Sequence, residues 1–354
     1  MCFSRILGID GERAEAGQPV TAEVISAQQE TWIRPNMPAD RTAILHVGTY
    51  KTGSSSIQNL LYKNRDLLAT HGMLYPQSGL TKDAVIGHRH RRLIPPVLSG
   101  KTSSYVTQEL QSELKTAPQH SVIISNEAWS NPRLQPMLGG FVTELADMGF
   151  SRIAGILFLR RLIDYKVSHY REFTFRQGNK TPFHNYLLQP PGMFDYLFIM
   201  RNFRAIFRSD LHVLDYSRIN NSVPAFFDAL GLCDILPKLV PVEKANIKPV
   251  GALGVEVMRH VNMQGLNRKK GLRFIDYFES RNPGLFKEEW TERDGPETFR
   301  YGGHYRKELA DVLGWPAEDV DRLLEDRPLS GQSLEKARPL IEAELTEWIR
   351  RTTG

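Results

Sequence analysis

The sequence predicts an α/β protein in which a central parallel sheet is covered by helices on both faces. Apolar, β-branched runs of strand length recur along the first two thirds of the chain, at residues 42–48, 121–125, 152–160 and 211–216. Segments with helical periodicity follow or separate these runs, starting at residue 54 and at 138–150 and 224–232. Strands that alternate with helices are joined by crossover connections, which favour a three-layer arrangement around a parallel sheet.

The composition is that of an ordinary globular protein. Its 354 residues are 41% hydrophobic and 24% charged, a length that suits one large α/β domain with additions or two domains. The formal net charge is +5, from 45 Lys and Arg against 40 Asp and Glu. This mild excess is compatible with an anionic cofactor or substrate. No long basic run or RNA-recognition motif accompanies it, so we expect no nucleic-acid partner.

The number of cysteines and the length of the apolar runs exclude several classes of protein. Cys2 and Cys233 are the only cysteines, which leaves no disulfide framework and no multi-cysteine zinc site. The first residues lack the apolar segment of a signal peptide, and no run approaches the roughly 18 to 20 apolar residues that span a bilayer. We therefore expect a cytoplasmic protein without a membrane span. No sequence feature indicates an oligomeric state.

Composition divides the chain into three parts. Residues 1–41 carry scattered Gly, Pro and acidic residues and are interpreted as an N-terminal extension. Residues 42–240 hold the alternating strands and helices of the predicted core. Residues 241–354 are predicted to be mostly helical and to complete or cover the site. Amphipathic helices are expected there at 250–264, 304–314 and 334–350.

The loop within AILHVGTYKTGSSSIQNLL (43–61) has the features of an anion-binding turn. Gly48 and Gly53 keep the spacing of the ATP-binding pattern G-x-x-x-x-G-K-[ST]. Ser54 stands where that pattern has its lysine, and Lys51 lies two residues before Gly53. Backbone N–H groups of such a turn, and the start of the following helix, bind anionic oxygens. Ser54 or Ser55 is expected to be the N-cap of that helix.

Three interpretations of this loop compete. The first is a Gly/Ser-rich turn without a ligand, the second is the ATP-Mg site of a nucleotide kinase or NTPase, and the third is a site for another anion. The hydroxyls of Thr52 and of residues 54–56, together with the strand and helix on either side, favour a ligand. An ATPase also needs an acidic residue for magnesium at a neighbouring strand end, where Glu127 stands. The displaced lysine argues against ATP.

The loop HVGTYKTGSSSIQ resembles the 5′-phosphosulfate-binding loop of sulfotransferases that use 3′-phosphoadenosine 5′-phosphosulfate (PAPS), and most of all their bacterial branch. The segment LFLRRLIDYKVSHY is similar to a second family motif, a strand that ends in arginine with a serine eight positions later, here Arg160 and Ser168. VLDYSRINNSVPAFFDALGL resembles the family's strand, tyrosine and helix ending in LGL. The resemblance covers roughly residues 42–265.

The resemblance implies a P-loop fold that binds PAPS as donor, releases 3′-phosphoadenosine 5′-phosphate (PAP) and needs no metal. Lys51 is implied to contact the oxygen that bridges sulfur and the 5′-phosphate, and Arg160 with Ser168 to hold the 3′-phosphate. An arginine fork suits phosphate oxygens, whereas Arg161, one position along the strand, faces the other way. The implied donor-binding residues are Tyr50, Lys51, Thr52, Gly53, Ser54, Ser55, Ser56, Arg160 and Ser168.

An acceptor hydroxyl must lose its proton during transfer, so a general base is expected near the loop. Glu127 follows the strand 121–125 and resembles the catalytic glutamate of sulfotransferases that act on heparan-type sugars. A helix N-terminal carboxylate or an ion pair is the other interpretation of Glu127. His90 in GHRHRRL (87–93) is the second candidate and fits the family form H-x-x-L better than His88. Two other interpretations of the segment 87–93 are a solvated basic stretch and a group of arginines that guides an anionic acceptor.

Further segments are candidates for closing the site. NRKKG (267–271) and RYGGH (300–304) are alternative loops over the 3′-phosphate, and the aromatic-rich segment 170–188 lines an acceptor cleft or packs in the core. The resulting hypothesis is a PAPS-dependent sulfotransferase that sulfates a hydroxyl of a small molecule or glycan, with carbohydrate or glycolipid implied by the resemblance alone. A kinase-like NTPase using ATP-Mg and a non-catalytic nucleotide-binding protein are the alternatives.

Overall fold

The computed structural model describes most of the chain after the N-terminal forty residues. The described residues are 41–81, 88–94, 99–101, 103–187, 192–219, 221–242, 251–288, 290–291, 301–325 and 332–353. The predicted extension therefore lies outside the described residues, apart from Arg41, which begins the first strand.

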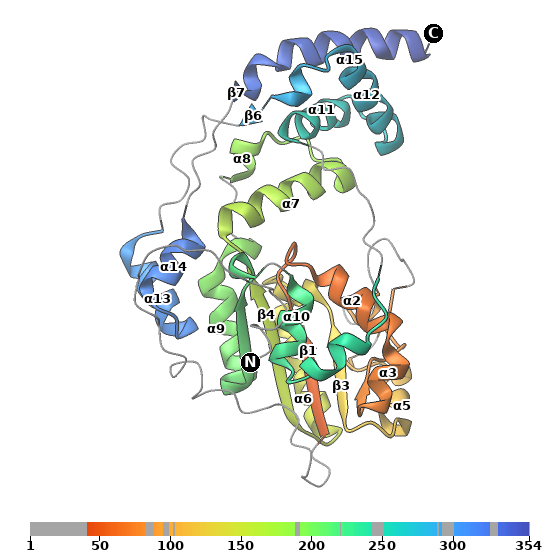
Figure 1. Cartoon of the computed structure of the whole chain (residues 1–354), viewed down its shortest axis with the longest axis vertical. Helices are drawn as coiled ribbons and strands as arrows, with labels where there is room; N and C mark the ends of the chain where they lie inside the picture. The colour runs from red at the N-terminus through yellow and green to blue at the C-terminus, as the bar shows by residue number, and fades with distance from the viewer. Residues whose placement is uncertain are drawn as a thin grey trace, which may run out of the picture.

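A five-stranded parallel sheet forms the centre of the molecule, with the strand order β2-β3-β1-β4-β5 (Figure 1). The strands are β1 Arg41–His46, β2 Met73–Leu74, β3 Ser121–Ser125, β4 Phe150–Leu159 and β5 Leu211–Asp215. The predicted α/β class with a parallel sheet is confirmed, and each predicted strand is present with small shifts at its ends. The two-residue edge strand β2 was not predicted, because so short a run carries no periodicity.

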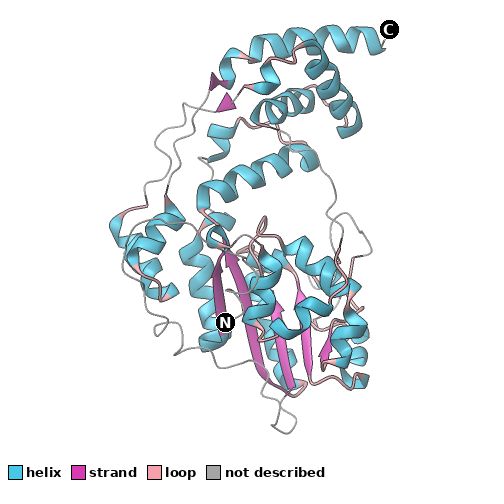
Figure 2. Ribbon diagram, in the orientation of Figure 1, coloured by secondary structure: helices cyan, strands magenta, loops and turns pink. Residues whose placement is uncertain are grey.

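Helices cover both faces of this sheet (Figure 2). On β1, Ala43 and Leu45 pack into one apolar cluster while Ile44 packs into the other, as the two-residue period of a strand requires. The first cluster includes helices α5 Gln108–Thr116, α6 Gln135–Asp147, α9 Tyr196–Phe207, α13 Gly303–Leu313 and α14 Ala317–Leu324. The second includes α2 Ser54–Lys63, α3 Arg65–Thr70 and α10 Ser222–Ala229.

A further group of helices lies beyond the carboxyl ends of the strands. It contains α11 Ala252–Met263, α12 Arg268–Arg281 and α15 Arg338–Thr353, which share an apolar core of their own with Trp290 (Figure 1). The short strands β6 Trp290–Thr291 and β7 Gln332–Ser333 pair beside this core. The helices predicted at 250–264 and 334–350 belong to this group. The helix predicted at 304–314 is α13, which packs against α9 of the sheet-containing part instead.

Helix α7 Leu162–Gln177 runs between the sheet and these outer helices, followed by the short α8 Phe183–Leu187 (Figure 1). Its first turn follows β4 directly, and the hydroxyl of Tyr196 on α9 donates to the Arg160 carbonyl at 2.6 Å. At its other end, the buried amide of Asn262 on α11 donates to the carbonyls of Thr174 and Asn179, each at 2.9 Å. Both ends of α7 are therefore held by other helices.

Candidate active site

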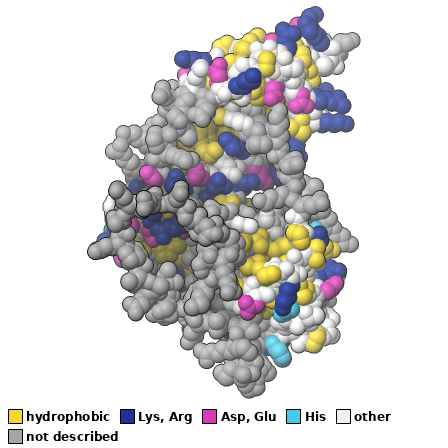
Figure 3. All heavy atoms as spheres, viewed as in Figure 1, with side chains coloured by type: hydrophobic (Ala, Val, Ile, Leu, Met, Phe, Trp, Pro, Cys, Tyr) yellow, Lys and Arg dark blue, Asp and Glu magenta, His cyan; other side chains and the backbone are white. Residues whose placement is uncertain are grey.

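A cavity of about 990 Å³ opens at the carboxyl ends of the central strands. Many of the residues that line it follow β1, β3 and β4 in the chain or lie on α7, and others come from the segments 89–91 and 186–194 and from Tyr301. Ligands of open parallel sheets bind at this edge. Its polar wall consists mainly of charged side chains, and Figure 3 shows basic and acidic side chains together in the band between the sheet-containing part and the outer helices.

The loop after β1 is held in an unusual backbone conformation. Gly48, Lys51 and Gly53 have φ angles of 49°, 68° and 82°, and lysine rarely adopts such a value. The Thr52 hydroxyl donates to the Thr49 carbonyl at 2.7 Å, and the Thr49 hydroxyl donates to the Phe158 carbonyl of β4 at 2.9 Å. The loop is thus tied to itself and to the neighbouring strand. Thr52 is fully buried by these contacts and does not line the cavity.

Helix α2 begins at Ser54 with Gly53 as its N-cap and without a side-chain capping bond. The prediction of Ser54 or Ser55 as the N-cap is therefore wrong, because the left-handed Gly53 starts the helix one residue earlier. The Ser54 hydroxyl is therefore not used to cap the helix. It is 6% exposed, lines the cavity and has no hydrogen-bond partner among the described residues. A buried hydroxyl in that state is costly unless a ligand oxygen meets it.

Arg160 and Ser168 both line this same cavity. Arg160 directly follows β4, and its guanidinium donates to the Lys51 carbonyl at 2.9 Å while lying over the Tyr216 ring. Ser168 lies on α7. Arg161 does not line the cavity, and its guanidinium lies 4.0 Å from Glu325 at the end of α14. The structure therefore brings the loop after β1 and the end of β4 together, although Arg160 and Lys51 are 109 positions apart.

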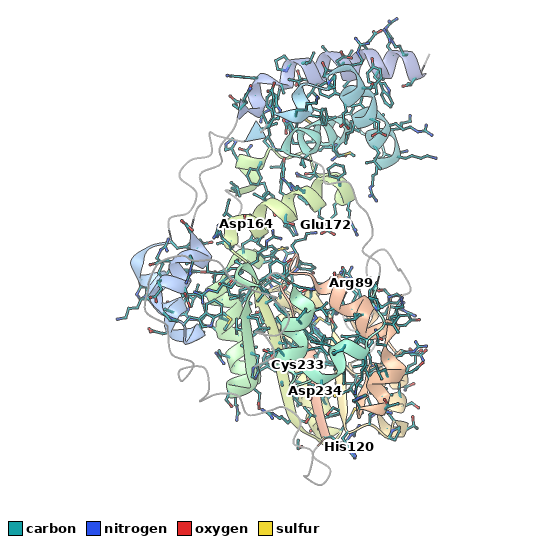
Figure 4. The ribbon with its side chains drawn as sticks, in the orientation of Figure 1. Arg89, His120, Asp164, Glu172, Cys233 and Asp234 are labelled. Carbon is teal, nitrogen blue, oxygen red and sulfur yellow. The ribbon has the colours of Figure 1, made fainter. Side chains whose placement is uncertain are left out.

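Glu172 is a cavity residue that sequence reasoning missed. Its Oε2 lies 3.1 Å from the Lys51 ammonium and its Oε1 lies 3.4 Å from Arg176. Burial on its own would raise the pKa of the Glu172 carboxyl, but Lys51 and Arg176 together hold that pKa below its ordinary value. Figure 4 shows Glu172 on α7 and Arg89 across from it. One available signal is spacing, since Ser168, Glu172 and Arg176 recur every four residues and share one helix face.

Glu127 begins a short 3₁₀ helix, η2 Glu127–Ser130, immediately after β3. Glu127 is about 5% exposed and lines the cavity. The Gln58 amide of α2 donates to Glu127 Oε2 at 2.8 Å, and Arg89 forms an ion pair with the other oxygen. Gln58 also donates to Ser125 Oγ at 3.1 Å. The carboxylate is thus both near the loop and held in one orientation.

His90 does not reach the cavity. Its side chain is fully buried, with Nε2 bonded to the Pro76 carbonyl at 3.0 Å and Nδ1 accepting from the Ser125 N–H at 3.1 Å. Burial lowers the pKa of His90 to about 4, so its imidazole is neutral at physiological pH. His88 stacks on Tyr62 and bonds to Asn59. The structure thus leaves neither histidine on the cavity wall, whereas Glu127 is on it.

Aromatic side chains form the less polar wall. From the segment 170–188, Phe173 and Tyr186 line the cavity, while Tyr170 and Phe183 do not line it and pack with Tyr186 in an apolar cluster that includes Val255 of α11. The rest of this wall comes from Tyr50, His169, Leu187, Met193, Phe194 and Tyr301.

The two candidate closing loops lie in different places. Tyr301 of RYGGH lines the cavity, and Arg300 lies outside the described residues. NRKKG instead forms the first turn of α12, where Asn267 caps the helix by accepting from the Lys270 N–H. No residue of NRKKG lines the cavity.

Comparison with known proteins gives one likeness to report. No protein-family model matches the chain, and no curated protein matches it. A solved sulfotransferase from Alicyclobacillus acidocaldarius is similar to 80% of this chain over 99% of its own, at 12% sequence identity and a TM-score of 0.38. Within the described residues, no helix is long and apolar enough to cross a membrane, and no group of His, Cys, Asp and Glu has an arrangement suited to a metal ion.

Proposed function

We propose that this protein is a PAPS-dependent sulfotransferase that sulfates a hydroxyl of a carbohydrate or glycolipid acceptor. One observation carries the proposal: the loop 50–56, apart from the buried Thr52, and the pair Arg160 and Ser168 line a single cavity at the carboxyl edge of the sheet. A nucleotide with phosphate-type groups at both its 5′ and 3′ positions needs two such anion sites in one cavity.

The residues present suit this donor. The unpartnered Ser54 hydroxyl and the start of α2 would hold the 5′-phosphosulfate, because backbone N–H groups and a helix N-terminus favour anionic oxygens. Arg160 and Ser168 would hold the 3′-phosphate, which an arginine fork binds through two parallel hydrogen bonds. A volume of about 990 Å³ also leaves room for an acceptor beside a nucleotide.

Lys51 and Glu127 supply the chemistry that the chain contributes. PAPS provides a sulfuryl group whose S–O bond to the 5′-phosphate breaks as a new S–O bond forms to the acceptor oxygen. Lys51 stabilises the negative charge that develops on the departing phosphate oxygen, and Glu127 takes the proton of the acceptor hydroxyl. Gln58 and Arg89 orient the Glu127 carboxylate for that step.

An ATP-Mg enzyme is the second candidate, and the contacts of Glu127 argue against it. A magnesium-binding carboxylate needs oxygens that face the phosphates. Glu127 already forms an ion pair with Arg89, so a magnesium ion at the same carboxylate would meet a like charge. The position of Lys51 also argues against ATP, because this lysine precedes the second glycine of the loop and its ammonium is paired with Glu172.

Calorimetry with PAP, 5′-AMP and ATP-Mg tests the proposal. PAP is expected to bind at least about tenfold more tightly than 5′-AMP, a difference of about 1.4 kcal/mol. Equal affinity for PAP and 5′-AMP would overturn the proposal, and tighter binding of ATP-Mg would favour the kinase alternative. Transfer of labelled sulfate from PAPS to a glycan panel separates an enzyme from a non-catalytic binding protein. Lys51→Ala should remove that transfer, whereas Lys269→Ala, on an exposed turn of α12, should not.

A further inference from the structure

Positive side chains outnumber carboxylates on the cavity wall. The positive residues are Lys51, Arg89, Arg91, Arg133, Arg160, Lys166 and Arg176, and the acidic residues are Glu127 and Glu172. Glu172 is paired with Lys51 and Arg176, and Glu127 is paired with Arg89. Arg91 and Arg133 form no ion pair with a carboxylate of the described residues. They are also not among the residues that the proposed function assigns to PAPS.

Arg91 and Arg133 both lie close in the chain to the Glu127 ion pair. Arg133 follows η2, the 3₁₀ helix that begins at Glu127, and Arg91 begins the 3₁₀ helix η1 Arg91–Leu93 two residues after Arg89. Both side chains belong to exposed residues and both line the cavity. Both guanidinium groups therefore line the same cavity as Glu127, and a ligand that fills this cavity can contact all three side chains.

His90 explains why Arg91 is held there. The His90 N–H donates to the Ser125 carbonyl at 2.9 Å, the Ser125 N–H donates to His90 Nδ1 at 3.1 Å, and the Asn126 amide donates to the His90 carbonyl at 3.3 Å. These bonds join His90 to Ser125, the last residue of β3, and to Asn126, the residue before Glu127. The arginines on either side of His90 consequently keep a defined position relative to the proposed base.

We infer that Arg91 and Arg133 form a second anion subsite, which binds an acidic group of the acceptor; the inference rests on the proposed sulfotransferase function. Guanidinium groups bind carboxylates and sulfate esters bidentately and attract them over a distance. The acceptor class is then an acidic sugar, either a uronic acid or an already sulfated glycan. The competing explanation is that both arginines add positive charge for PAPS alone.

Calorimetry on the full chain tests the subsite by binding, without requiring turnover. The probes are a uronic-acid tetrasaccharide, its carboxyl-reduced neutral counterpart, and the neutral tetrasaccharide carrying one sulfate ester, each titrated with and without saturating PAP. At least one acidic probe is expected to bind about tenfold more tightly than the neutral one in the presence of PAP. Which acidic probe binds identifies the group. Equal binding of all three probes, or displacement of the acidic probe by PAP, would overturn the inference.

Variants test whether Arg91 and Arg133 cause the preference for acidic probes. Arg91→Gln and Arg133→Gln are each expected to weaken binding of the acidic probe by about three- to tenfold while PAP affinity stays unchanged. Arg273→Gln, an exposed arginine of α12 away from the cavity, is the matched control. If both variants instead weaken PAP binding and keep the preference for acidic probes, the arginines serve the donor and the subsite does not exist. Loss of PAP binding by the unmodified chain would contradict the proposed function separately, since the acidic probes are also titrated without PAP.

Discussion

The ammonium of Lys51 lies 3.1 Å from Oε2 of Glu172, so the lysine that the proposed mechanism uses is engaged by a carboxylate of α7. Lys51 also has a left-handed backbone, with φ of 68°. A phosphate or sulfate oxygen that binds Lys51 must therefore compete with Glu172. This competition sets the affinity of the loop for anions below what its hydroxyls and backbone would otherwise give.

Glu172→Gln is expected to strengthen PAP binding by about two- to fivefold. Both side chains of the pair are about one third exposed, and such ion pairs are worth about 0.2–1 kcal/mol after solvent screening. Calorimetry at low and high salt measures the effect, which should shrink as salt rises. Glu347→Gln, which breaks a comparable ion pair on the remote helix α15, is the control. Unchanged or weaker PAP binding in Glu172→Gln would show that the pair does not compete with the nucleotide.

Arg160→Ala is expected to weaken PAP binding by about ten- to a hundredfold, because a charged hydrogen-bonding partner contributes about 1.5–3 kcal/mol. The loss should be confined to the 3′-phosphorylated nucleotide. Affinity for 5′-AMP, measured by the same calorimetry, should change far less. Arg161→Ala serves as the neighbouring control, since that side chain points toward Glu325. An equal loss for PAP and 5′-AMP would mean that Arg160 acts through its 2.9 Å bond to the Lys51 carbonyl instead.

Gln58→Glu is expected to move the acid limb of the activity profile to higher pH. The substitution places a second carboxylate at the position of an amide that now lies 2.8 Å from Glu127, and like charges disfavour the ionised form of a neighbouring carboxyl. The pH dependence of kcat/KM for sulfate transfer measures this shift. Gln58→Met, which removes the hydrogen bond without adding charge, should lower kcat with a smaller displacement of the profile. Identical profiles in all forms would argue against Glu127 as the base.

Folding stability is expected to fall as the pH drops from about 6.5 to about 4. Burial lowers the pKa of His46 and of His90 from 6.5 to about 4. In that window the unfolded chain binds a proton at each imidazole while the folded protein does not, so the free energy of unfolding decreases by up to about 1.4 kcal/mol per pH unit for each histidine. Urea unfolding at pH 7.5, 6 and 5 measures the slope.

His90→Gln is the variant that checks the origin of this slope. It should be less stable than the unmodified chain at pH 7.5, by about 1–3 kcal/mol, because the Ser125 N–H loses its buried acceptor. Its stability should also depend less steeply on pH. His304→Gln changes an exposed histidine of α13 and should leave the slope as it is. A slope that is the same in His90→Gln would assign the acid sensitivity to other groups.

Local sequence patterns predicted the residues that sit at strand ends. Lys51, Glu127 and Arg160 each follow a recognisable buried strand, and parallel strands present their carboxyl ends at one edge, so these residues meet. His90 was ranked as a second base because His90 to Leu93 fits the form H-x-x-L of the family that the sequence resembles. Its burial depends on β3, 35 positions later in the chain, and no local pattern reports such a contact.

Backbone conformation and long-range pairing account for the other differences. The αL conformation of Gly53 moved the N-cap of α2 away from the serines, since serine is favoured at caps only when the chain enters the helix from an extended conformation. The spacing of Glu172 from Ser168 and Arg176 is a weak signal, because a carboxylate on a helix face is usually solvated. The roles of the cavity residues remain predictions that the experiments above test.

The support of α7 at both ends has a consequence for the whole chain. Helix α7 carries the cavity wall with Ser168 and Glu172. Its start is held by the Tyr196 hydroxyl and its other end by the buried amide of Asn262 on α11. The outer helices therefore help to hold that wall in place, although no residue of α11, α12 or α15 lines the cavity. Substitutions in α11, α12 or α15 can therefore change the positions of Ser168 and Glu172 in the cavity without altering any residue of the loop after β1.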